Sequence, residues 1–156
     1  MYTVLGGKVM KKYDKYQKFI RYKYGYYSFN LLISLFLFNY FLGLIFNFQW
    51  AATKELEVII IMFVVVLFFV NISVYQNAYF RKGENKKSYS WLFLIVGLFS
   101  LYTAFQTFLI SPEEIIIDGK LGRGVIQLFS GLIFISIPLT YFIRVRIDKK
   151  MENKEQ

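Results

Sequence analysis

The chain has 156 residues, 56% of them hydrophobic, and a net charge of +9, and its mean hydropathy is +0.43. A soluble domain of this size would lack the polar surface to cover so many apolar residues, so the composition predicts an integral membrane protein. The chain has neither Cys nor His, which excludes disulfides, thiol chemistry, imidazole ligation of metals and general-base catalysis by histidine. We therefore expect no catalytic residue, no metal site and no cofactor.

Residues 1–26 are predicted to form a cytoplasmic segment at the membrane surface, because tyrosines alternate there with seven Lys or Arg residues. We favour a short amphipathic helix lying in the head-group layer. The alternative is a basic tail that only sets the topology. Aromatic and basic residues together also suit RNA, but a segment tethered at a membrane is poorly placed for that role, so we expect no nucleic-acid partner.

Four long apolar stretches follow, at residues 27–48, 58–80, 91–110 and 125–143, and none contains Asp, Glu, Lys or Arg. Each is long enough to cross a hydrocarbon core of about 30 Å as a helix. The sequence therefore predicts an all-α membrane protein, an antiparallel bundle of four transmembrane helices at 27–143. Because the connections are short, helices that follow one another in the sequence are expected to pack side by side.

The basic residues are distributed unevenly between the connecting segments. Sixteen Lys or Arg residues lie in segments 1–26, 81–90 and 144–156, and only three lie in the other two connections. The positive-inside rule then places both termini, including the basic tail 144–156, in the cytoplasm of a plasma-membrane protein. The richness in Phe, Ile, Lys, Asn and Tyr suggests a bacterium of low GC content.

Small and polar side chains recur at helical spacing within the spans. These residues are Asn39, Gly43, Asn71, Gly97, Ser100, Ala104, Gln127, Gly131 and Pro138. In lipid, small residues allow helices to approach closely and amides form hydrogen bonds between them, so we interpret these positions as helix–helix contacts. The alternative is a polar path or ligand site at the bundle centre. Pro138 is expected to kink the last helix.

The connection 111–124 contains the most turn and helix signals. Ser111 followed by Pro112 and two acids is typical of a helix start, and Asp118-Gly119 is a turn signal. The isoleucines at 115–117 either dip back into the membrane interface, which we favour, or form a contact site for a partner. The residues of this candidate partner loop are Glu113, Glu114, Ile116 and Asp118.

With no ionisable residue in the predicted spans, proton-coupled transport is disfavoured. We expect a small non-catalytic protein that contacts the lipid bilayer and binds another membrane component, either another protein or a second copy of itself. An accessory subunit and an immunity-type protein are the two forms of this hypothesis. The alternative is a small oligomeric channel or transporter for an uncharged or lipidic solute. Pairing of the span amides within one protomer would favour binding over transport.

Overall fold

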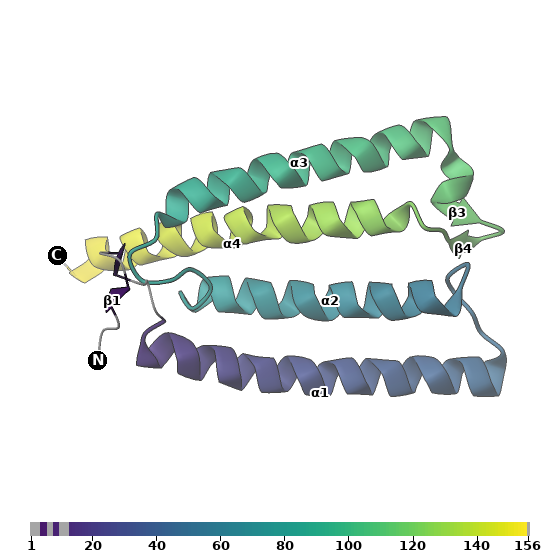
Figure 1. Cartoon of the computed structure of the whole chain (residues 1–156), viewed down its shortest axis with the longest axis horizontal. Coiled ribbons are helices and arrows are strands. Elements are labelled where there is room, and N and C mark those ends of the chain that lie inside the picture. Colours follow the sequence, from purple (N-terminus) through teal and green to yellow (C-terminus); the bar gives the residue numbers. More distant parts are fainter. Residues whose placement is uncertain (1–3, 6–7, 10–12, 156) are drawn as a thin grey trace.

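In the computed structural model, which describes residues 4–5, 8–9 and 13–155, four long helices dominate (Figure 1). The helices are α1 (Lys15–Phe46), α2 (Lys54–Tyr75), α3 (Lys86–Ile110) and α4 (Val125–Glu155). Each is long and apolar enough to cross a membrane. The predicted all-α class with four transmembrane helices is confirmed.

The helices stand side by side in the order α1, α2, α4, α3 (Figure 1). α1 packs on α2, α2 on α4, and α4 on α3, so α4 lies between α2 and α3. The expectation that the short second connection makes α2 and α3 direct neighbours is therefore wrong. Close approach of α3 to α4 through small residues, described below, is the physical reason. Aromatic and aliphatic side chains are exposed along the edge helices α1 and α3, as helices in contact with lipid require.

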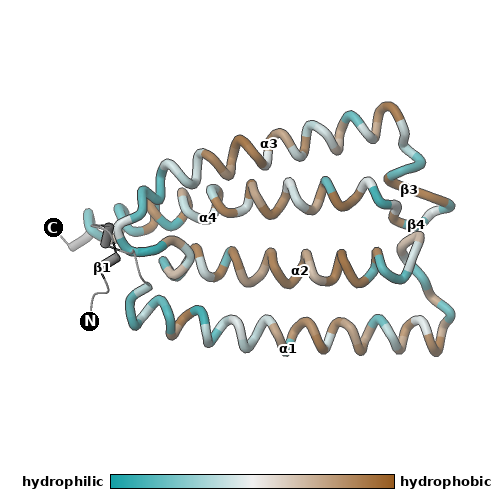
Figure 2. The backbone as a smooth tube through the Cα atoms, in the orientation of Figure 1, coloured by the Kyte–Doolittle hydropathy of each residue, from teal (hydrophilic) through white to brown (hydrophobic). Residues whose placement is uncertain are grey.

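The two ends of this row of helices differ in composition. We call one the basic end: it holds the start of α1, the α2–α3 connection and the end of α4 (Figure 1). The segments that are richest in Lys and Arg share this end, which is mostly hydrophilic in Figure 2, whereas the opposite end mixes hydrophilic and hydrophobic residues. The other, the hairpin end, holds the α1–α2 connection and residues 111–124.

The start of α1 is fixed by a capping box. The Asp14 carboxylate accepts from the Gln17 backbone N–H at 2.7 Å, and the buried Gln17 amide donates to the carbonyls of Asn77 and Phe80 at 2.9 and 2.8 Å. Residues 15–26 are thus helical, but as the first turns of α1 and not as a separate interfacial helix. Within the segment 1–26, residues 1–3, 6–7 and 10–12 lie outside the described residues; β1 (Val4–Leu5) and β2 (Lys8–Val9) pair antiparallel.

The bounds of α2 differ from the predicted span 58–80. Thr53 caps the helix by accepting from the Leu56 N–H at 3.3 Å, so α2 begins at Lys54 and includes Glu57. It ends at Tyr75, two residues before Asn77, whose φ of 55° breaks the helical conformation. Two carboxylates, Glu55 and Glu57, therefore belong to α2, although both lie outside the predicted span.

Residues 111–124 fold into a short 3-10 turn, η1 (Pro112–Glu114), followed by the strands β3 (Ile116–Ile117) and β4 (Lys120–Leu121). The two strands pair antiparallel, joined by Asp118 and Gly119 with φ of 50° and 76°. Positive φ at both turn residues is the geometry of a tight two-residue hairpin, so the predicted turn is confirmed. Ser111 makes no capping bond through its side chain, and the predicted helix start yields only this three-residue turn.

Candidate functional site

The glycines of α3 and α4 lie where these two helices are closest. A Cβ atom added at Gly97 would lie 2.6 Å from Cγ1 of Ile135 and 2.9 Å from its backbone nitrogen. A Cβ atom at Gly131 would lie 2.6 Å from Cδ2 of Leu101. Both distances are shorter than carbon contacts in packed proteins, so the α3–α4 contact depends on glycine at both positions.

The same contact continues toward the hairpin end. Ala104 is buried, the Ser100 hydroxyl donates to the backbone carbonyl of Gln127 at 2.8 Å, and the Thr107 hydroxyl lies 3.4 Å from the Gln127 side-chain oxygen. The structure thus brings together the small and polar residues of the third and fourth spans. They contribute to the contact between these two helices, and Thr107 and Gln127 also line a small pocket beside it.

Asn71 joins α2 to α4. Its amide nitrogen donates to Oγ of Ser136 at 2.9 Å, and its oxygen accepts from the Thr140 hydroxyl at 2.5 Å. Pro138 lies between these two partners in α4 and is almost completely buried, and α4 stays helical through it. Asn71 therefore lies at the α2–α4 contact, where every polar atom of the amide has a partner.

Asn39 takes part in a different arrangement, at the hairpin end of α1. Its amide nitrogen donates to Oε2 of Glu57 at 2.9 Å, and its oxygen accepts from the indole N–H of Trp50 at 2.6 Å. Gly43, one turn further along α1, makes no close helix contact: a Cβ atom there would meet only the carbonyl oxygen of Phe48, at 3.8 Å. Gly43 instead lines a pocket.

Glu57 is the centre of this arrangement, and the sequence pattern missed it. Its side chain is only 4% exposed. Oε1 accepts from the backbone N–H groups of Trp50 and Ala51 at 2.9 and 3.4 Å, in addition to the bond from Asn39 to Oε2. A buried carboxylate needs such donors, since an unpaired one would be strongly destabilising.

A signal for Glu57 is present in the sequence. Thr53 is a good N-cap, and a helix that starts directly after it places Glu57 three and four residues before Ile60 and Ile61. Both isoleucines are buried. Glu57 therefore lies on the buried face of α2, although as a residue of a short polar connection it looks solvated.

The Glu57 contacts hold the α1–α2 connection in place, and the β3–β4 hairpin packs on that connection. The Ala52 N–H donates to the Leu121 carbonyl at 2.8 Å, and the Leu121 N–H donates to the Trp50 carbonyl at 3.0 Å. Ala51, Leu56, Ile60 and Val125 form a buried apolar cluster beneath them. The two connections thus make one folded cap on the hairpin end.

The candidate partner loop forms the exposed part of this cap. Glu113, Glu114 and Asp118 are exposed, and Ile116 and Ile117 are 54% and 40% exposed. Ile115 alone turns inward, onto the buried cluster beneath the cap. Ile116 and Ile117 are kept at the surface by the hairpin, where they can contact either the membrane interface or a partner, so both predicted alternatives stay open for these two residues.

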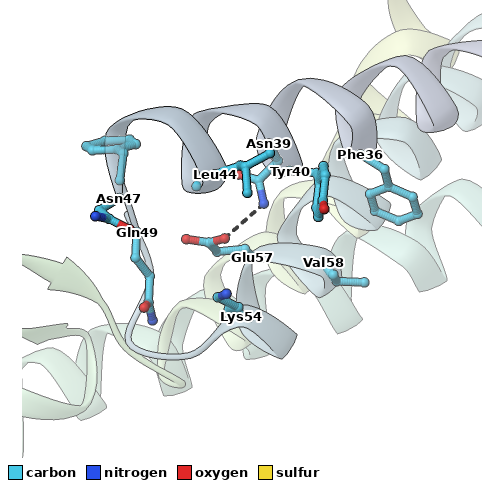
Figure 3. Close-up of a pocket in the computed structure, with 11 residues that line it drawn as sticks. Phe36, Asn39, Tyr40, Leu44, Asn47, Gln49, Lys54, Glu57 and Val58 are labelled. Atoms are coloured by element: carbon cyan, nitrogen blue, oxygen red, sulfur yellow. Dashed lines mark hydrogen bonds between the residues drawn. The ribbon is translucent and has the colours of Figure 1, made fainter.

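A pocket of about 420 Å³ lies between α1 and α2 beside the cap (Figure 3). Its wall combines the apolar side chains of α1 with the charged first turn of α2. The lining residues are Phe36, Asn39, Tyr40, Gly43, Leu44, Asn47, Phe48, Gln49, Lys54, Glu57 and Val58. We call it the α1–α2 pocket.

No protein-family model, curated protein or solved structure matches this chain significantly. Its function is therefore inferred from its own residues. The cap and the α1–α2 pocket both combine polar groups with exposed apolar side chains.

Proposed function

We propose that the protein is a non-catalytic component of the plasma membrane that binds another membrane protein through its cap, as an accessory subunit or an immunity-type protein. The observation that carries this proposal is the folded cap with two exposed isoleucines, Ile116 and Ile117, beside three exposed acids. Exposed isoleucines on a rigid hairpin supply an anchor, and the acids around them supply specificity.

The intramolecular pairing of the span amides favours binding over the channel alternative. Asn39, Asn71 and Gln127 all have side-chain partners within the chain, and Gln106 donates to Tyr102 one turn away on the same helix. The contacts of Asn39, Asn71 and Gln127 lie at three separate helix pairs, α1–α2, α2–α4 and α3–α4. A conducting path would need polar groups that face a common space.

The orientation is proposed from the charges. With sixteen Lys or Arg residues in the segments of the basic end, that end is expected in the cytoplasm and the cap on the opposite side of the membrane. Alkaline phosphatase fused after Phe48 or Ile117 should be active, whereas the same enzyme fused after Lys82 or at the C-terminus should be inactive. An active C-terminal fusion would refute this orientation.

The partner surface is tested by removing one anchor. Ile116→Ser should weaken capture of the partner by about 10- to 100-fold, since burying one isoleucine at an interface is worth about 1.5–3 kcal/mol. The measurement is affinity purification of the tagged protein in mild detergent, followed by titration of the identified partner. Met151→Ser is the matched control, because Met151 is 48% exposed but lies near the end of α4, away from the cap. Equal binding by both variants would place the partner elsewhere.

A further inference from the structure

The α1–α2 pocket contains two opposite charges on one turn of α2. Lys54 and Glu57 are three residues apart and both line the pocket. Yet among the described residues they form no salt bridge with each other; the ion pair found there joins Arg144 to Asp148. Two opposite charges on one wall, without an ion-pair partner in the described part of the chain, are complementary to a ligand that itself has one positive and one negative group.

Glu57 keeps the capacity to accept a further hydrogen bond. Oε1 already takes two backbone N–H groups, but Oε2 takes only the Asn39 amide. Each carboxylate oxygen can accept two hydrogen bonds. Figure 3 shows the carboxylate directed toward α1 across the pocket, so a donor entering the pocket can reach Oε2.

Beside these charges and the amides of Asn39, Asn47 and Gln49, the pocket wall carries an apolar strip. Phe36, Tyr40 and Leu44 follow one another along α1 at four-residue spacing and cover about 12 Å of its length. Gly43 leaves open space beside them, since a Cβ atom there would make only an ordinary contact, with Phe48. The pocket therefore has a polar end, with both charges, and an apolar strip along a membrane-spanning helix. This combination is complementary to an amphiphilic ligand.

We propose that the α1–α2 pocket binds a phospholipid with a phosphoethanolamine headgroup. The phosphate contacts the Lys54 ammonium, the headgroup ammonium donates to Oε2 of Glu57, and one acyl chain lies along Phe36, Tyr40 and Leu44. Phosphatidylglycerol brings a negative charge but no cation for Glu57. Phosphatidylcholine has the same charges but no N–H to donate.

The test is native mass spectrometry of the purified full-length protein in mixed micelles. The lipids are phosphatidylethanolamine, phosphatidylglycerol and phosphatidylcholine with identical acyl chains. We expect phosphatidylethanolamine to be retained about tenfold better than either of the others. Equal retention of the three lipids, or a preference for phosphatidylglycerol, would overturn the proposal.

Two variants locate the lipid in this pocket. Lys54→Gln should reduce retention of phosphatidylethanolamine by about tenfold, because the phosphate loses its cation. Gly43→Leu should abolish retention by filling the open space. The controls are Lys120→Gln, a lysine at the same end outside the pocket, and Ile45→Trp, which adds bulk on an exposed face of α1. The melting temperature of each variant must match that of the unmodified protein. Unchanged retention of phosphatidylethanolamine in both pocket variants would refute the site.

A soluble ligand with the same headgroup is distinguished by competition. Short-chain phosphatidylethanolamine should displace the bound lipid at concentrations at which free phosphoethanolamine does not. Equal displacement by the two compounds would mean that the apolar strip contributes nothing, and the lipid assignment would be wrong.

Discussion

Gly97→Leu is expected to destabilise the protein strongly, by forcing apart two helices that pack through this glycine. A Cβ atom at this position would already be 2.9 Å from the backbone nitrogen of Ile135, which cannot rotate away as a side chain could. A leucine must therefore push α3 and α4 apart, and the surrounding contacts of Ala104 and Ser100 are lost with it. We expect destabilisation of about 3 kcal/mol, the top of the usual range for overpacked positions.

Thermal unfolding followed by circular dichroism in detergent micelles measures this effect. Leu98→Trp and Ile95→Trp are the controls, since these side chains are 55% and 65% exposed on the same helix. Both should unfold within a few degrees of the unmodified protein. A melting temperature for Gly97→Leu as high as theirs would show that α3 does not contact α4 through this face.

Glu57→Ala is expected to detach the cap from the helices. The substitution removes the acceptor of three donors: the N–H groups of Trp50 and Ala51 and the amide of Asn39. Each buried donor left without an acceptor costs about 1–3 kcal/mol, so the combined loss should be about 3 kcal/mol or more. Glu57→Gln should lose less, because its side-chain oxygen can still accept from the backbone.

Trp50 reports this change directly. In a Trp91→Phe background, Trp50 is the only tryptophan, and its emission should shift to longer wavelength in Glu57→Ala as water reaches the indole. Glu55→Ala is the matched control, since Glu55 lies on the same turn but is exposed. Identical spectra and melting temperatures for the two alanine variants would argue against a structural role for the Glu57 carboxylate.

The residues behind these two expected losses of stability differ in how well the sequence alone predicts their importance. Gly97, Ser100 and Ala104 stand out because small residues at helical spacing are unusual among large apolar ones, and the structure places them together against α4. Nothing in the spacing says which helix they contact. For Glu57 the sequence signal is weaker, the Thr53 N-cap and the spacing to Ile60 and Ile61, because its burial also depends on how the cap folds over it.

The sequence by itself determined the class of the protein, the number of its membrane-spanning helices and the segregation of its basic residues. These are properties of each segment taken alone: a bilayer requires about 20 apolar residues per helix, and charge is counted loop by loop. The Asp118-Gly119 turn belongs with them, because turn geometry is set by the backbone preferences of two adjacent residues.

Only the tertiary structure decided that α4 lies between α2 and α3, that Ile115 turns inward while Ile116 stays exposed, and that Glu57 is buried beside an open pocket. Each of these depends on contacts between residues far apart in the chain. In lipid no hydrophobic drive selects helix partners, so close packing and a few hydrogen bonds make the choice, and these exist only once the helices are side by side.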